Sequence, residues 1–409
     1  MLTIEQNELL TRIGRGTPMG GLIRRYWIPA LFADQLPGPD CDPVRVKLMG
    51  ESLIAFRDTL GRIGLLQELC PHRTASLFFG RNEECGIRCI YHGWKFDVEG
   101  NCVDLPTEPP TSTIKERVKA RAYPCIERGG LIWTYMGPAE HRPEFPAIEW
   151  TELPASHRRI SRRLQECNWL QALEGGFDST HLSFLHKGDL SFSHPLPSDF
   201  EFKVTDSGFI CGYGREIDGR MMWSSDTLLM PFHKLIGTEL PGAHTWVPVD
   251  DETTLLYSVD YNPEQPLSEA QHAAYASGDR MHAVNEAGSD RMAQNRDNDY
   301  RIDRTHQRSG KSFSGIRGIG VQDTAIQESM GLIADRSQEN LGVGDLGIVQ
   351  LRRYLLRAVE DYQAGRDIPA QEPKSYRMRP LCSYTPKGPT MTEIMDTHLK
   401  AMTALAMRA

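Results

Sequence analysis

Residues 70–92 read CPHRTASLFFGRNEECGIRCIYH and contain two short boxes in which a cysteine and a histidine stand close together. The first box is Cys70-Pro71-His72, and the second is Cys89-Ile90-Tyr91-His92. Thiolates and imidazoles are the side chains that bind soft and borderline transition metals. Two loops that each supply one ligand of each kind therefore predict a metal centre held between two hairpins.

The mixed composition of the boxes favours an iron–sulfur cluster over zinc. A structural Cys₂His₂ zinc site usually takes both cysteines from one box and both histidines from the other, and it remains the alternative. In a Rieske [2Fe–2S] cluster, two thiolates hold one iron and two imidazoles hold the other, which raises the potential from about −400 mV to about −150 mV or above. The pattern predicts that Cys70, His72, Cys89 and His92 bind such a cluster, whereas Cys85 takes no part.

Length and composition set the outer limits. A chain of 409 residues is too long for one compact core, so two domains are expected. The net charge of −8 argues against a nucleic-acid partner, and nine cysteines without a dense spacing suit a reducing compartment. The N-terminus lacks the pattern of a signal peptide, and no apolar run is long enough to span a membrane. We therefore expect a cytoplasmic protein that does not enter a membrane.

Short β-branched and aromatic segments, separated by Gly, Pro and Asp turns, surround the two boxes. They are residues 44–48, 53–56, 64–66, 87–90 and 131–135. These segments predict an all-β domain over residues 20–137. The proline-rich stretch 138–154 reads as a crossing, so residues 1–19 and 138–409 are assigned to a second domain.

The second domain mixes helical and strand patterns, which indicates an α+β fold with helices gathered on an antiparallel sheet. Thr3 and Gln6 form a capping box that opens a first helix. The predicted helices are 3–13, 169–185, 267–283, 286–298, 323–335, 345–364 and 389–409. The predicted strands are 202–204, 209–213, 221–229, 244–249 and 253–260.

The predicted helix that begins at Trp169 carries a second set of possible metal ligands. Glu174, Asp178 and His181 are spaced i, i+4 and i+7, which places them on one helical face. His186 lies off that face unless the helix ends near residue 185 or contains a π-bulge. Two histidines and one carboxylate with open positions form the facial triad of mononuclear non-haem Fe(II) oxygenases. A one-electron cluster needs an acceptor, so the two sets together indicate an oxygenase.

With both sets in place, the chain resembles the oxygenase component of Rieske non-haem iron aromatic oxygenases. More narrowly, it resembles the phthalate dioxygenase-like single-subunit branch, which includes 3-chlorobenzoate, isophthalate and phenoxybenzoate dioxygenases. The resemblance implies a Rieske domain inserted near the start of a helix-grip (START-like) catalytic domain. Besides the two boxes, the matching positions are Asn168, Trp169, Gln171, 178–186, 298–304, 312–320, 322–329, Asp335, Arg336, Arg352 and Arg353.

The resemblance implies that His181 and His186 hold a mononuclear iron and that Asp323 is its third protein ligand. Asp323 also fits a simpler reading, as the cap of the helix that begins near it. Other carboxylates compete with it for the iron. They are Glu328, Asp335 and Asp345, and the last of these reads more simply as a helix N-cap.

Asp178 has a separate implied role. In the family, an acid at this place bridges a cluster histidine of one subunit and an iron histidine of the next, which here are His92 and His181. A carboxylate bound to both imidazoles orients them and gives a short path between the metals. Asn168 and Glu174 are expected near the site, and a purely structural role is the alternative for both.

The partners follow from what the chain lacks. Gly315, Gly318 and Gly320 have the wrong spacing for a nicotinamide or flavin fingerprint, and no plant-type ferredoxin pattern is present. We therefore expect no bound flavin or NAD and a separate NAD(P)H-dependent reductase as electron donor. An electron path that crosses subunits requires a homo-oligomer, and the resemblance implies a trimer or a hexamer of stacked trimers.

The implied reaction is O₂-dependent cis-dihydroxylation of an aromatic ring. The alternative is monooxygenation or O-demethylation of an aromatic carboxylate, and a third hypothesis is an electron carrier without chemistry of its own. The arginines that hold phthalate in relatives match Ser207 and His244 here, which argues against a substrate with two adjacent carboxylates. We expect a meta-substituted benzoate, with Ser179, His244 and Trp246 as candidate pocket residues.

Overall fold

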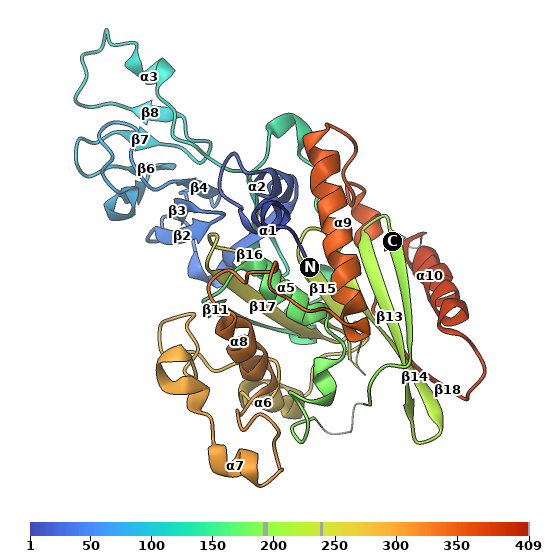
Figure 1. The fold of residues 1–409 in the computed structure, drawn as a ribbon. Coiled ribbons are helices and arrows are strands. Elements are labelled where there is room, and N and C mark those ends of the chain that lie inside the picture. Colours follow the sequence, from blue (N-terminus) through green and yellow to red (C-terminus); the bar gives the residue numbers. More distant parts are fainter. Residues whose placement is uncertain (191–194, 238–239, 408–409) are drawn as a thin grey trace. The chain divides into compact units, whose positions relative to one another are not determined.

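The computed structural model describes residues 1–190, 195–237 and 240–407, and it divides into two compact units (Figure 1). The smaller unit is residues 23–142. The larger unit combines residues 1–22 with residues 143–409. The smaller unit is thus an insertion near the start of the larger one.

The smaller unit consists of short antiparallel strands in three sheets, as the sequence predicted. The first sheet has the order β1 (Trp27–Phe32), β10 (Leu131–Tyr135), β9 (Cys125–Arg128). The second has the order β2 (Val44–Leu48), β3 (Glu51–Arg57), β4 (Ile63–Gln67). The third has the order β5 (Arg81–Glu83), β6 (Gly86–Arg88), β7 (Lys95–Phe96), β8 (Cys102–Asp104). A single helical turn, α3 (Ile114–Arg117), follows the last sheet.

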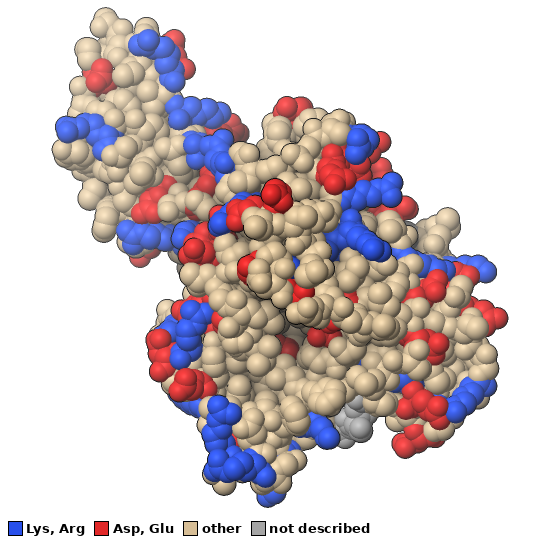
Figure 2. All heavy atoms as spheres, in the orientation of Figure 1, with Lys and Arg blue, Asp and Glu red and all other residues tan. Residues whose placement is uncertain are grey.

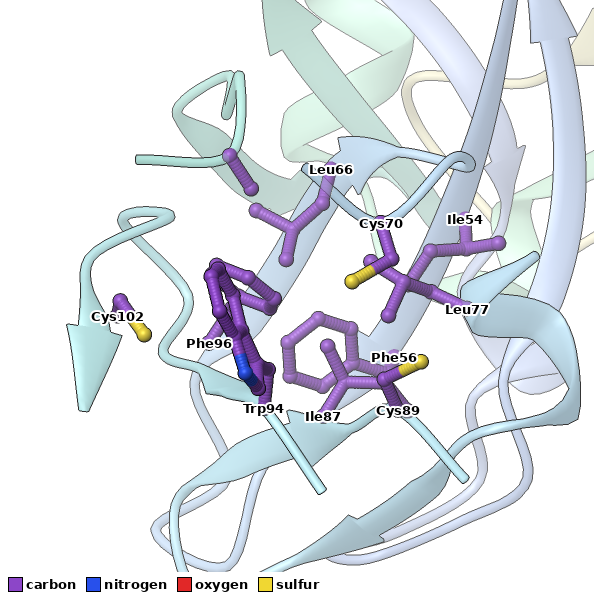
Figure 3. Close-up of a cluster of buried hydrophobic side chains, with 11 residues drawn as sticks. Ile54, Phe56, Leu66, Cys70, Leu77, Ile87, Cys89, Trp94, Phe96 and Cys102 are labelled. Carbon is purple, nitrogen blue, oxygen red and sulfur yellow. The ribbon is translucent and has the colours of Figure 1, made fainter. Parts of the chain in front are cut away.

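A buried apolar cluster packs around the cysteines of the two cysteine–histidine boxes. Figure 3 shows Cys70 and Cys89 among the packed side chains of this cluster. The other labelled members are Ile54, Phe56, Leu66, Leu77, Ile87, Trp94, Phe96 and Cys102. Because these side chains are buried and closely packed, the loops that carry the thiols start from a rigid base.

One antiparallel sheet of eight described strands forms the centre of the larger unit. Its order is β11 (Arg158–Gln165), β17 (Thr254–Tyr261), β16 (Gly242–Pro248), β15 (His233–Ile236), β14 (Arg220–Leu229), β13 (Gly208–Ile217) and β12 (Asp199–Thr205), with β18 (Cys382–Thr385) also paired to β14. The five predicted strands of this domain all overlap these elements. The expected antiparallel sheet with helices is therefore confirmed.

Helices cover both faces of this sheet (Figure 1). The helices of this unit are α1 (Ile4–Thr11), α2 (Pro18–Ile23), α4 (Glu149–Glu152), α5 (Trp169–Phe177), α6 (Glu269–Ala276), α7 (Arg304–Arg308), α8 (Ile319–Ser329), α9 (Leu346–Gln363) and α10 (Met391–Met407). Cys211 on β13 faces Gly347 of α9, whereas a Cβ at Gly212 would meet Met391 and Met395 of α10. Successive strand residues point to opposite faces, so α9 and α10 lie on opposite sides of β13.

Several predicted helices match well at one end or both. Thr3 and Gln6 form the predicted capping box of α1, and α9 fills nearly all of the predicted 345–364. The helix predicted over 389–409 corresponds to α10, and its last two residues lie outside the described part of the chain. No helix that the structure describes is long and apolar enough to cross a membrane.

Two polar helices were predicted wrongly. The stretch 267–283 forms only the short α6, and 286–298 forms no α-helix. The Ser289 N–H donates to the Glu286 carbonyl in a turn, and the Asn295 side chain accepts the Asp297 N–H. A side chain such as that of Asn295 competes with the helix for backbone hydrogen bonds. The polar pattern alone did not reveal this competition.

Strands β11 and β15 were missed for different reasons. β11 reads RRISRRLQ, and its charged residues hide the strand pattern. The strand can still form because Arg162 pairs with Asp290 and Arg163 donates to the carbonyl of Met281. β15 is only four residues long, which is too short for a clear strand pattern. Figure 2 shows that, on the visible face, basic and acidic side chains are likewise interspersed.

A buried ionic cluster ties the helices of the larger unit together. Glu174 of α5 pairs with Arg336 at 2.9 Å and with Arg352 of α9 at 2.6 Å. Arg336 also donates to the Asn7 side chain of α1. Burial raises the pKa of Glu174, but the two arginines outweigh burial and hold that pKa below its ordinary value. Glu174 therefore has a structural role, which the sequence left open.

Replacing Glu174 by Gln is expected to lower the free energy of unfolding of the larger unit by about 3–5 kcal/mol, because two buried arginines lose their partner. The depressed pKa means that the wild-type contribution is present above pH 4.5 and is lost as the pH falls further. Denaturant unfolding at pH 7 and at lower pH measures both effects. Glu8→Gln, which breaks an exposed pair with Arg12, is the control and should cost less than about 1 kcal/mol. Equal losses in the two variants would contradict the prediction.

Candidate metal centres

In the smaller unit, the two boxes bring their thiols together as one pair and their imidazoles together as another. The Cys70 and Cys89 thiols interact with each other, and both residues are buried. The His72 and His92 rings are 4.5 Å apart between centroids. A pair of thiols beside a pair of imidazoles suits two irons with different ligands better than one tetrahedral zinc.

The donor atoms of this site fit a metal cluster. The Nδ1 atom of His92 is buried and has no hydrogen-bond partner in the part of the chain that the structure describes. Burial, together with a smaller effect of the neighbouring Cys89, raises the pKa of the Cys70 thiol to about 11. A thiolate in this environment therefore needs a cation such as iron beside it.

Neighbouring groups hold the two histidines in orientations that a cluster can use. The His72 ring stacks on Trp94 at 4.2 Å, and the Tyr91 ring lies 3.8 Å from that of His92. Burial, His92 and Arg73 lower the pKa of His72, which favours the neutral imidazole that binds metals. Gly93 adopts a positive φ of 76°, which ends the second box in a tight turn after residue 92, and the strand predicted over 87–90 already ends at residue 88.

In the larger unit, His181, His186 and Asp323 converge. One ligand atom from each lies within 4.8 Å of the others. Oδ1 of Asp323 is 3.0 Å from Nε2 of His186 and 3.5 Å from Nε2 of His181. These three are the only group of at least three such side chains with single-metal spacing among the described residues. Two imidazoles and one carboxylate on one side of a metal leave its other positions free.

The predicted helix 169–185 is wrong beyond residue 177. α5 ends at Phe177, Asp178 has extended backbone angles (φ −87°, ψ 101°), and His181 begins a single 3₁₀ turn. Oδ1 of Asp178 accepts hydrogen bonds from the Thr180 N–H and hydroxyl and from the His181 N–H. This turn replaces the helix. Asp178 and His181 therefore do not share a helical face, and no π-bulge is needed to bring His186 to the site.

The end of α5 is set by close packing at two glycines. A Cβ at Gly176 would come within 2.5 Å of the Trp246 ring on β16, and a Cβ at Gly175 would meet the Gln327 side chain of α8. Asn168 caps the other end of α5 and ties it to the carbonyls of Thr11 and Asp251. The helix is thus fixed at both ends, and the ligand loop leaves it from a defined point.

Asp323 lies in the second turn of α8, whose N-cap is Gly318, so the alternative role as a helix cap is wrong. The competing carboxylates have other partners. Glu328 accepts from the Glu166 N–H and the Tyr300 hydroxyl, Asp335 accepts from Ser337, and Asp345, although at the N-cap position of α9, accepts from the Gly342 N–H.

Gln322 is a further residue of this site, and sequence reasoning missed it. Its Nε2 donates to the Ile316 carbonyl at 2.7 Å, so its Oε1 is left to accept from Nδ1 of His186 at 2.6 Å. This contact fixes the His186 tautomer with Nε2 free toward Asp323. Its position directly before Asp323 was the available signal.

Charge is concentrated in the three-residue site. Burial lowers the pKa of His181, but hydrogen bonds with Asp178 and Asp323 outweigh burial and raise it to about 9. Burial raises the pKa of Asp323, yet the two histidines hold it well below its ordinary value. Without a metal, the carboxylate is thus ionised and His181 protonated, and a divalent cation can take the place of that proton.

The three candidate pocket residues are all buried. Ser179 lies in the ligand loop, while His244 and Trp246 lie on β16 with their rings 5.4 Å apart. Burial lowers the pKa of His244 well below its ordinary value, and Arg163 lowers it further, so this ring is neutral at pH 7. Nε1 of Trp246 is buried without a hydrogen-bond partner in the described ranges.

Comparison with protein families separates the same two parts. Residues 26–121 match the Rieske [2Fe-2S] domain, and residues 134–196 and 229–398 match the family described as LigXa C-terminal domain like. The second match covers more than half of the chain.

Relatives of known activity match over almost the whole length. The chain is 37% identical to the 3-chlorobenzoate-3,4-dioxygenase oxygenase subunit of Comamonas testosteroni, covering 90% of this chain and 91% of the relative. It is 36% identical to the phthalate 4,5-dioxygenase oxygenase subunit of Pseudomonas putida, covering 94% and 92%. It is 32% identical to the 5,5'-dehydrodivanillate O-demethylase oxygenase subunit of a Sphingobium species, covering 100% and 91%.

Solved structures share the fold at lower identity. Dicamba monooxygenase bound to dicamba matches with a TM-score of 0.61 and 16% identity, covering 84% of this chain and 99% of that one. A Pseudomonas putida NdmA variant with caffeine matches with a TM-score of 0.62 and 21% identity, covering 88% and 97%.

Proposed function

The chain belongs to the oxygenase components of the Rieske non-haem iron oxygenases, in the branch that contains 3-chlorobenzoate and phthalate dioxygenases, and from this we propose that it hydroxylates an aromatic carboxylate. It is an oxidoreductase with a Rieske [2Fe–2S] domain and a mononuclear iron site. The observation that carries the proposal is the convergence of His181, His186 and Asp323 at single-metal spacing.

The side chains around the iron site have distinct roles in this proposal. His181, His186 and Asp323 would hold the iron and would leave its remaining positions to O₂ and substrate. Gln322 holds the His186 ring in one tautomer. Bound Fe(II) supplies the activation of O₂. Buried and neutral, His244 offers the substrate a hydrogen-bonding edge without a charge.

The preferred reaction is cis-dihydroxylation of a meta-substituted benzoate. One arene, one O₂, two electrons and two protons give one cis-dihydrodiol. A separate NAD(P)H-dependent reductase would supply the electrons. The similarity to the 3-chlorobenzoate enzyme supports this choice of substrate.

O-demethylation or another monooxygenation of an aromatic carboxylate is the second candidate. One relative, which matches over the full length of this chain, is an O-demethylase subunit, so the fold and the metal ligands suit both reactions. The hypothesis of a pure electron carrier is less well supported, because such a carrier does not need three converging metal ligands in a separate unit.

We also propose that Asp178 connects the two metal centres of neighbouring subunits. Its Oδ2 lies 3.7 Å from Nδ1 of His181, and its side chain is about a quarter exposed. An exposed carboxylate edge can accept a hydrogen bond from His92 of the partner subunit. This role requires a homo-oligomer, for which a trimer or stacked trimers are the candidates.

A substrate panel with a compatible reductase tests the proposed function. Dihydroxylation predicts O₂ uptake coupled to a cis-diol or catechol from a substituted benzoate such as 3-chlorobenzoate. O-demethylation predicts formaldehyde and a phenol from a methoxybenzoate. If uncharged aromatics are turned over and carboxylates are not, the proposed substrate class is wrong.

A further inference from the structure

Arg215 on β13 is a buried cation without a counter-ion. Its side chain is fully buried, and no carboxylate lies within ion-pair distance in the part of the chain that the structure describes. Its Nη1 has no hydrogen-bond partner among those residues. Burying a charged group without a partner is costly, and such groups are usually paired or serve a ligand.

The guanidinium of Arg215 lies against the loop that carries the iron ligands. Its Nη2 donates to the carbonyl of Ser179 at 2.5 Å, and its Nε donates to that of Pro195 at 3.0 Å. Ser179 stands between Asp178 and His181 in this loop. The unused Nη1 is therefore held next to the segment that shapes the iron site.

Strand alternation puts Arg215 on the helix-covered face of the sheet. Phe209, Cys211, Tyr213 and Arg215 alternate along β13 and share that face. Phe209 packs on Phe177 of α5 at 6.2 Å, and Cys211 faces α9. The Tyr213 ring lies 4.4 Å from the guanidinium carbon and helps to orient it by a cation–π contact.

The neighbouring charges do not compensate Arg215. Asp226 on β14, which is paired with Cys211 and so lies on this face, forms an ion pair with Lys234 at 2.8 Å. Lys234 also donates to the carbonyl of Gly176. Lys234 thus engages the Asp226 carboxylate, which leaves the charge of Arg215 without an acidic partner among the described residues. An anionic group of a bound ligand can neutralise it.

We propose that Arg215 binds the carboxylate of the aromatic substrate through Nη1 and so selects acids over neutral aromatics. The inference rests on the proposed function and adds to it a residue at a different place from Ser207 and His244. Arg215 has a rigid planar fork of donors, which suits a carboxylate better than a point charge does. Nη2 holds the ligand loop at Ser179 and Nε holds the carbonyl of Pro195, which leaves Nη1 for the ligand.

The test uses the holoenzyme, loaded with both metals and kept anaerobic, with 3-chlorobenzoate and 3-chlorobenzamide as probes. The probes are similar in size and differ in charge. Arg215→Gln is expected to raise the Kd of 3-chlorobenzoate on the order of 100-fold and to change that of 3-chlorobenzamide less than about 3-fold. Arg215→Lys retains the charge but loses the fork, so the Kd of 3-chlorobenzoate should rise by only about 10-fold. Titration calorimetry measures the Kd of each probe for the wild type and for each variant.

Arg220→Gln is the matched control, because it removes an exposed arginine from the same hairpin and changes the net charge equally. It should leave both Kd values within about 2-fold. If Arg215→Gln does not fold, a crystal structure of the wild-type holoenzyme with 3-chlorobenzoate decides instead, and a carboxylate within hydrogen-bond distance of Nη1 is expected.

Three outcomes would overturn the inference in distinguishable ways. If Arg215→Gln weakens the binding of both probes equally, Arg215 only stabilises the ligand loop. An unchanged preference for the acid in that variant, or a carboxylate bound elsewhere in the crystal structure, means that another group selects it, and the proposed function stands. A wild-type enzyme that prefers the amide refutes the proposed substrate class together with the role of Arg215.

Discussion

Asp323→Ala is expected to lower turnover at least about 100-fold and to leave the visible absorption spectrum of the [2Fe–2S] cluster unchanged. Oδ1 of Asp323 is the atom that both imidazoles approach, at 3.0 and 3.5 Å. Even the loss of a residue that only orients a metal ligand typically costs about 10- to 100-fold in metal affinity or activity. Loss of the ligand itself should cost more, because two neutral imidazoles then face the cation alone.

Iron analysis and turnover measure this prediction together. After anaerobic loading with Fe(II), the variant should retain its cluster iron and lose mononuclear iron. Asp335→Ala is the matched control: Asp335 competed for the same role in the sequence, but its carboxylate accepts from Ser337 in an exposed turn. Full activity in Asp323→Ala, or an equal loss in Asp335→Ala, would remove Asp323 from the ligand set.

The type of chemistry could be predicted from the sequence because the ligands of the cluster lie close together along the chain. The boxes that end in His72 and His92 each fit within four residues, so their spacing survives any error in secondary structure. The role of Asp323 could be predicted only from the resemblance, because Asp323 lies far along the chain from the two histidines. Its neighbour Gln322 lies 136 residues from His186. Periodicity contains no information about such a long-range contact. The resemblance predicted this role for Asp323 because the whole segment 322–329 matched the family, rather than a single acidic residue.

The geometry around the ligands could not be predicted by the same means. The apolar pattern of α5 continues past Phe177, but the Asp178 side chain captures the N–H groups that the next helical turn needs. The charged β11 was missed because the partners of its arginines, Asp290 and Met281, lie 128 and 118 residues further along the chain. Arg215 stood out only once its burial and missing partner were known. In each case, the three-dimensional contacts of the side chains decided the outcome.

Asp178→Asn is expected to retain both metals and the fold but to slow electron transfer to the iron by about 10- to 100-fold. Burial raises the pKa of Asp178, yet His181 and Thr180 outweigh burial and hold the pKa at about 2, so the wild-type carboxylate is ionised at neutral pH. In the Asp178→Asn variant, the amide oxygen can still accept from Thr180 and His181. The substitution thus spares the turn and changes the Oδ2 edge, which would accept from His92 of the partner subunit.

Single-turnover kinetics separate this role from a structural one. The reduced enzyme is mixed with O₂ and substrate, and reoxidation of the cluster is followed by its absorption. Thr180→Val is the control, because it removes one hydrogen bond of the turn, worth about 1 kcal/mol, and leaves the carboxylate charge in place. If both variants slow reoxidation equally, Asp178 acts only by shaping the ligand loop. If Asp178→Asn reoxidises at the wild-type rate, the bridge does not exist. A slow Asp178→Asn beside a normal Thr180→Val locates the electron path at the charged edge that faces away from the turn.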